Sequence, residues 1–159
     1  MKTIIIYDTF YGNTERIAFA ISEALNSGEG TATLKVGDAK PEQLTGLDYL
    51  IVGSPTRGFR PTKPISAFLN SVPADGLKGV KVASFDTRIS TVDVKPGVLG
   101  FFVNLFGYAA KPIADALVKK GGILAVPPEG FYVEGSEGPL KEGELERAAA
   151  WAKLIIGAR

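Results

Sequence analysis

Short apolar runs alternate with longer amphipathic stretches along this chain of 159 residues. The first run, residues 4–7, is continuous and rich in β-branched residues, which is typical of a strand buried on both faces of a parallel sheet. We therefore predict strands at residues 4–7, 31–36, 47–53, 80–85 and 123–133, the last of them bent at Pro127 and Pro128.

The stretches between these runs repeat apolar residues at helical spacing. We predict helices at about residues 13–26, 61–72, 107–120 and 142–156, and one helical turn within the connection 37–46. Trp151 lies on the apolar stripe of the last helix, so we expect it to anchor the core. Together the elements predict an α/β fold in a single domain, residues 1–159. We expect a three-layer sandwich in which a five-stranded parallel sheet of order 2-1-3-4-5 carries helices on both faces.

The first junction between a strand and a helix carries the strongest chemical signal. The N–H groups that begin a helix have no partner inside it and attract anions. Gly12 lets the backbone curl around an oxyanion, and donor side chains stand at Thr9, Tyr11, Asn13 and Thr14. The loop contains no Lys or Arg, so we expect neutral hydrogen bonds to a phosphate monoester. The alternative is an ordinary capping turn with Asn13 or Thr14 as the cap.

Two further loops follow strands that should end at the same edge of the sheet, where such folds bind ligands. Residues 53–61 follow the third strand and are either part of this site or a Gly-Pro surface turn. Residues 85–89 follow the fourth strand. The next segment, residues 90–106, is very apolar for a loop, so we expect it to be buried, to cover a ligand or to meet a partner.

Composition excludes several classes of function. The chain has no Cys and no His, which excludes disulfides and Cys-His or Ser-His catalysis and argues against an ordinary transition-metal site. A net charge of +1 is too small to indicate a nucleic-acid partner. No apolar run approaches the roughly 20 residues of a membrane span, and no signal segment precedes the first strand, so we expect a cytoplasmic protein.

Residues 7–15 closely resemble the phosphate-binding signature of flavodoxins, in which an apolar strand leads into TxxGNT. The resemblance, to a short-chain flavodoxin with an apolar insertion after the fourth strand, implies noncovalent FMN. It places the phosphate against Thr9, Phe10, Tyr11, Gly12, Asn13 and Thr14. It places the flavin ring against Ser54, Pro55, Thr56, Arg57, Gly58 and Phe59, and against Phe85, Asp86, Thr87 and Arg88. Phe101, Phe102, Tyr108 and Phe59 are weaker candidates for an aromatic stacked on the ring.

Arg57 departs from the family pattern, since many flavodoxins have Trp or Tyr at this position. We hypothesise that Arg57 or Arg88 stabilises the anionic reduced flavin; Arg57 as a solvated surface residue is the alternative. The resemblance also implies that the peptide between Arg57 and Gly58 faces flavin N5 and turns over on reduction, which glycine permits. Flavodoxins tend to be strongly acidic, and this chain is not.

The resemblance implies an electron carrier that uses FMN between redox partner proteins, as a monomer or weak dimer without catalytic residues. One alternative is an NAD(P)H-dependent quinone or flavin reductase on the same fold, with the apolar insertion at a dimer interface. A second alternative is a binding domain without a cofactor, in which the phosphate loop is only a helix cap.

Overall fold

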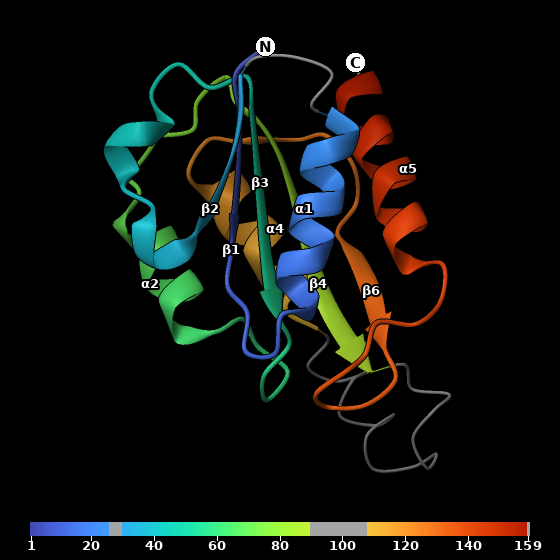
Figure 1. The fold of residues 1–159 in the computed structure, drawn as a ribbon. Coiled ribbons are helices and arrows are strands. Elements are labelled where there is room, and N and C mark those ends of the chain that lie inside the picture. The colour runs from blue at the N-terminus through green and yellow to red at the C-terminus, as the bar shows by residue number, and fades with distance from the viewer. Residues whose placement is uncertain (26–29, 90–107, 159) are drawn as a thin grey trace.

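The computed structural model describes residues 1–25, 30–89 and 108–158, whose strands form one parallel sheet. The strands are β1 Thr3–Tyr7, β2 Thr31–Lys35, β3 Tyr49–Pro55, β4 Lys81–Ile89, β5 Ile123–Leu124 and β6 Glu129–Val133. Their order is β2-β1-β3-β4-β5, and β6 also pairs with β4. The predicted order 2-1-3-4-5 is therefore confirmed. The carboxyl ends of β1, β3 and β4 lie together at the lower edge in Figure 1.

The predicted fifth strand is interrupted rather than bent. β5 pairs with Lys81 and Val82, whereas β6 pairs with residues 85–89 of the same neighbour, β4. From Val82 to Phe85, β4 advances by three residues, while the segment that pairs with it advances by five, from Leu124 at the end of β5 to Glu129 at the start of β6. The excess residues include the two prolines, which have no N–H to donate to a sheet.

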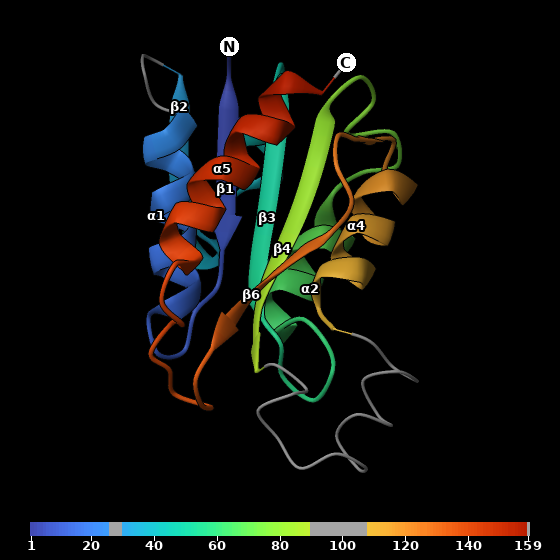
Figure 2. The same ribbon diagram turned by 90° about the vertical axis from the view of Figure 1, so that its right-hand side faces the viewer.

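Helices cover both faces of the sheet (Figure 2). They are α1 Asn13–Leu25, α2 Lys63–Ser71, α4 Ala110–Lys119 and α5 Glu144–Gly157, with short 3-10 turns η1 Val36–Asp38 and η2 Pro41–Leu44. α1 and α5 pack on one face, where Ile5 and Ile51 are buried. α2 and α4 pack on the other, over Ile4 and Ile6. Within the described residues, no helix combines the length and apolarity needed to cross a bilayer.

Trp151 anchors the core as predicted. Its ring meets those of Phe85 and Phe131 edge to face, at centroid distances of 6.0 and 5.8 Å. Phe85 and Phe131 lie 6.0 Å apart, so the three rings form a closed cluster between the sheet and α5. Such pairs stabilise a core beyond the area they bury, by about 0.5–1.5 kcal/mol each.

β4 is longer than predicted and runs through Ile89 instead of ending at Phe85. Asp86, Thr87 and Arg88 pair with β3 or β6, or with both, so they belong to the strand and not to a loop. Because side chains alternate along a strand, neighbouring residues of this segment face opposite sides of the sheet.

The outer edge of β6 is covered by polar groups of the chain that follows it. The N–H of Tyr132 donates to Glu144 (2.7 Å), and the carbonyl of Tyr132 accepts the N–H of Lys141 (2.9 Å). Arg147 donates to the carbonyl of Gly130 and forms an ion pair with Glu144 (2.6 Å). Burial raises the pKa of Glu144, but hydrogen bonds from Arg147 and from the Tyr132 N–H hold it below its ordinary value overall.

Candidate functional site

A cleft of about 110 Å³ opens where the loops after β1 and β3 meet the end of β4. Most of the predicted site residues line it: Thr9, Phe10, Tyr11, Asn13, Thr14, Pro55, Thr56, Arg57, Thr87 and Arg88. Ile89, Val133 and Ser136 also line it. Ile89 lies in the predicted segment 85–89 but not among the predicted contacts, and Val133 and Ser136 were not predicted. The strand order was the signal for Val133 and Ser136, because it places the end of the fifth strand at this same edge.

The N-terminus of α1 offers free backbone donors to the cleft. The first helical hydrogen bond runs from the N–H of Arg16 to the carbonyl of Gly12 (3.0 Å). No described group accepts the N–H of Asn13, Thr14 or Glu15. Gly12 has φ +90°, a conformation that other residues rarely adopt. An ordinary cap by Asn13 or Thr14 does not fit this geometry, because the helix begins at Asn13 and its first N–H groups carry no side-chain acceptor.

Thr9 completes this donor set. Its hydroxyl oxygen accepts the N–H of Gly12 (2.9 Å), so the hydroxyl hydrogen is left to donate. The N–H of Thr9 itself is held by the carboxylate of Asp8 (2.9 Å). The loop therefore holds its curved shape by its own hydrogen bonds.

Asn13 and Thr14 hold the walls of the cleft together. The amide of Asn13 donates to the carbonyl of Glu137 (3.1 Å), which ties α1 to the loop after β6. The hydroxyls of Thr14 and Thr87 lie 2.7 Å apart in a buried hydrogen bond between α1 and β4. Gly138 approaches Asn13 so closely that a Cβ there would lie 2.6 Å from the amide nitrogen.

The loop after β3 is fixed to β4 and to α4. The N–H of Thr56 donates to the carbonyl of Thr87 (3.0 Å), and the hydroxyl of Thr56 accepts the N–H of Ala109 (3.2 Å). Ser54 is buried and accepts the N–H of Thr62 (3.0 Å), so it supports the loop from below and does not line the cleft.

A two-residue turn forms the tip of this loop. Arg57 and Arg60 exchange backbone hydrogen bonds of 2.9 and 3.0 Å, and both intervening residues, Gly58 and Phe59, have positive φ. These two residues border a separate hollow with Pro112 and are not part of the cleft lining. The Arg57 carbonyl accepts the Arg60 N–H, so turning this peptide over would break that bond.

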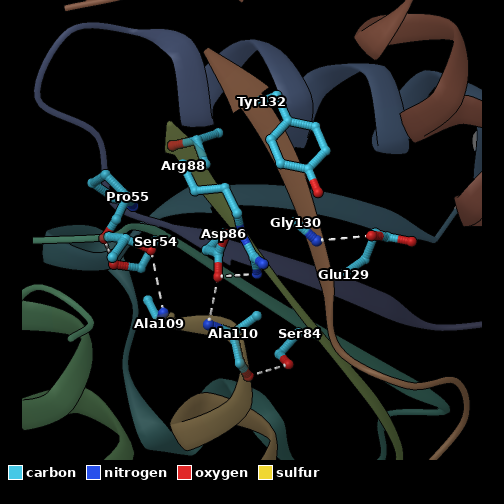
Figure 3. A network of polar contacts seen from close by, with 12 residues as sticks. Ser54, Pro55, Ser84, Asp86, Arg88, Ala109, Ala110, Glu129, Gly130 and Tyr132 are labelled. Atoms are coloured by element: carbon cyan, nitrogen blue, oxygen red, sulfur yellow. Dashed lines mark hydrogen bonds and ion pairs between the residues drawn. The ribbon is translucent and has the colours of Figure 1, made fainter. Parts of the chain in front are cut away.

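The side chain of Arg88 is locked in place (Figure 3). Its Nε and Nη2 donate to the two carboxylate oxygens of Asp86, each at 2.6 Å, and its guanidinium lies 3.7 Å above the ring of Tyr108. Asp86 is fully buried and also accepts the N–H of Ala110 (2.8 Å). Burial raises the pKa of Asp86 above its ordinary value, although the Arg88 guanidinium opposes this shift. Both oxygens nevertheless accept hydrogens from Arg88, which is the pairing of an ionised carboxylate.

Arg57 is held differently. Its guanidinium lies 4.6 Å from the centroid of the Phe10 ring, and both side chains are exposed. No described carboxylate pairs with it. Of the two arginines that line the cleft, Arg57 thus carries the charge that the described residues do not offset.

Phe85 was predicted to contact the cofactor, and its position in the structure contradicts this. The side chain has 0% exposure and packs against Phe131 and Trp151. Its side chain faces the side of the sheet that α5 covers, deep in the core. Tyr108, a weaker ring candidate, instead carries Arg88 on its face, and Phe101 and Phe102 lie outside the described residues.

Comparisons with known proteins agree with this architecture. The family model described as Flavodoxin matches residues 5–151. A flavodoxin of Aquifex aeolicus (strain VF5) is 38% identical, over 99% of this chain and 90% of that protein. A probable flavodoxin 1 of Bacillus subtilis (strain 168) is 29% identical over 80% of each chain. The crystal structure of oxidised Flavodoxin 1 from Bacillus cereus has the same fold, with a TM-score of 0.77, 18% identity and coverage of 99% of this chain and 98% of that one.

Proposed function

The chain belongs to the flavodoxin family, and from this premise we propose that it binds FMN noncovalently in the cleft and carries electrons between redox partner proteins. The single observation that supports the proposal most is the donor set at the start of α1. The N–H groups of Asn13, Thr14 and Glu15 have no described acceptor, and Asn13 and Thr14 line the cleft beside Thr9, whose hydroxyl hydrogen is left to donate.

The residues present fit a phosphate monoester. The helix N-terminus supplies partial positive charge and N–H donors, and Gly12 gives the loop the curvature that brings them together. The phosphate-binding loop, residues 9–14, contains neither Lys nor Arg. The anion would therefore be held by neutral donors and by the helix dipole, which suits a resident cofactor.

The remaining walls fit the ribityl chain and the flavin ring. Pro55, Thr56 and Arg57 form one wall, and Thr87 and Arg88 form another. Their backbones are tied together by the hydrogen bond between the Thr56 N–H and the Thr87 carbonyl (3.0 Å). When bound, the flavin would supply the electron chemistry, and these residues would orient it, limit its contact with water and set the local charge.

A titration of the apoprotein with FMN tests the proposal. We expect quenching of flavin fluorescence with one FMN per chain, and much weaker binding of riboflavin, which lacks the phosphate. Thr9→Ala removes one hydrogen bond to a charged group, at a cost of about 1.5–3 kcal/mol. It should weaken FMN roughly 10- to 150-fold and leave riboflavin unchanged. No quenching by FMN, or equal affinities for FMN and riboflavin, would refute the proposed site.

The competing reductase function has its own test. A reductase would use NADH or NADPH directly, so either nucleotide would bleach the FMN-loaded protein promptly without another protein. We expect the absorbance near 450 nm, about where oxidised flavin absorbs, to persist with both nucleotides. Prompt bleaching would replace the carrier by an NAD(P)H-dependent oxidoreductase.

A further inference from the structure

A second hollow, of about 930 Å³, adjoins the cofactor cleft. The two share Thr9, Phe10 and Arg57. The Arg57 guanidinium, lying over the Phe10 ring, therefore separates them and borders both. A molecule in the second hollow would contact side chains that also contact the contents of the cleft.

Basic side chains surround this hollow. Among the described residues they stand at Lys35, Arg57, Arg60 and Lys63. All four are exposed, and none forms an ion pair with another described residue. The carboxylate in the described lining, that of Asp8, is buried and accepts the N–H of Thr9. The net charge of +1 for the whole chain thus conceals a local excess of positive charge beside the cleft.

We propose that this basic surface, Lys35, Arg57, Arg60 and Lys63, docks an acidic face of the redox partner protein and orients that partner toward the cofactor cleft. The inference rests on the proposed function, because carrying electrons is what requires a protein partner. Arg57 links partner docking to cofactor binding, since it belongs both to the basic surface and to the wall of the cleft.

The arrangement of the charges favours a protein over a small anion. The four side chains come from three segments, which are the end of β2, the loop after β3 and the start of α2. They are all exposed, whereas a small-ligand site holds a few polar groups in an enclosed pocket. Exposed charge spread over a face is the arrangement that steers and orients a complementary protein.

A charge-reversal experiment tests the docking. The double variant Arg60→Glu with Lys63→Glu changes the basic surface but no residue that lines the cleft. Both side chains are exposed, and the helix dipole favours glutamate at the first position of α2. The matched control is Lys119→Glu with Lys153→Glu, an equal change of charge at exposed positions of α4 and α5. FMN affinity is measured first in all three proteins and should be the same.

The probe is reduced plant-type ferredoxin, an acidic iron–sulfur protein with a potential low enough to reduce a flavin. Its electron transfer to the FMN-loaded protein is followed by stopped flow at rising NaCl concentration. With the wild type we expect the rate to fall as salt rises. At low salt we expect the double variant to be slower by about tenfold or more and the control to remain within about twofold.

Equal rates in the two variants, or a wild-type rate that does not fall with salt, would overturn the docking alone. Bleaching by NADPH in the wild type but not in the Arg60 and Lys63 variant would make the hollow a nucleotide site and would also overturn it. Failure of the wild type to bind FMN would overturn the proposed function and the docking together, so the two failures are distinguishable.

Discussion

Gly130→Ala should destabilise the protein strongly although it adds only one methyl group. A Cβ at Gly130 would lie 2.1 Å from Nε and 2.2 Å from Cζ of Arg88, and the three atoms nearest to it all belong to that guanidinium. An ordinary contact is about 3.4 Å or more, so the guanidinium would have to move by roughly 1 Å. It is held between Gly130, Asp86 and Tyr108 and cannot move without lengthening its two 2.6 Å bonds to Asp86.

The size of the effect follows from the burial of Asp86. Removing the partner of a buried charge costs about 3–5 kcal/mol, and losing one hydrogen bond to a charged group costs about 1.5–3 kcal/mol. Arg88 retains 17% exposure and some freedom to adjust, so we expect a loss of about 2–4 kcal/mol in the free energy of unfolding. For a chain of this size that corresponds to a fall in Tm of roughly 4–16 °C.

The pH dependence gives this prediction a second signature. Burial already raises the pKa of Asp86 against the opposing effect of Arg88, and displacing Arg88 should raise it further. A carboxyl group whose pKa is raised in the folded state stabilises the folded protein at low pH. That stabilisation is lost as pH rises through the pKa of the folded state. The cost of Gly130→Ala should therefore be larger at pH 8 than at pH 5.

Urea denaturation of the apoprotein, followed by circular dichroism, measures these differences. Gly37→Ala is the matched control, because a Cβ at Gly37 meets no atom within 4 Å; it should lie within about 1 kcal/mol of the wild type. In an Arg88→Ala background, Gly130→Ala should become nearly neutral. An undiminished cost in that background, or a cost no greater than that of Gly37→Ala, would refute the reasoning.

Three further predictions concern the cleft, the core and the edge of the sheet. Arg57→Ala should make full reduction of bound FMN harder than in the wild type, because no described carboxylate offsets the positive charge of Arg57; an unchanged potential in a spectroelectrochemical titration would contradict this. Phe85→Leu should lower stability by about 1–3 kcal/mol and leave FMN affinity within about twofold, whereas a clear loss of affinity would return Phe85 to the site. Glu144→Gln should cost about 1 kcal/mol at pH 7. Because the pKa of Glu144 is lowered, the stability that its ionised form gives the folded protein is present above the ordinary value of 4.5 and is lost as pH falls below that value. A cost of Glu144→Gln that is unchanged at pH 3 in thermal unfolding would argue against the ion pair with Arg147.

The fold was largely predictable because its signals are local. Residues 4–7 of β1 and 49–52 of β3 are continuous apolar runs, and the residues from Gly12 onward mark the start of α1. Trp151 could be assigned to the core for the same reason, since its helix shows one apolar stripe.

The second half of β4 was not predictable in this way. Asp86, Thr87 and Arg88 are polar, and sequence patterns assign such residues to loops. They can lie in a buried strand because distant groups satisfy them, namely the Ala110 N–H, the Thr14 hydroxyl and the Tyr108 ring. Once these residues belong to a strand, position along β4 decides which side chains reach the cleft: Thr87 lines it near the end of the strand, whereas Phe85, two residues earlier on the same face, packs in the core under α5.

The covered outer edge of β6 also bears on how copies of this chain behave in concentrated solution. An open strand margin is a template on which another chain can add itself, and such addition is a common start of aggregation. Here the Tyr132 N–H, the Tyr132 carbonyl and the Gly130 carbonyl are already engaged by the protein's own Glu144, Lys141 and Arg147. Growth of fibres from this side would first require the start of α5 to detach.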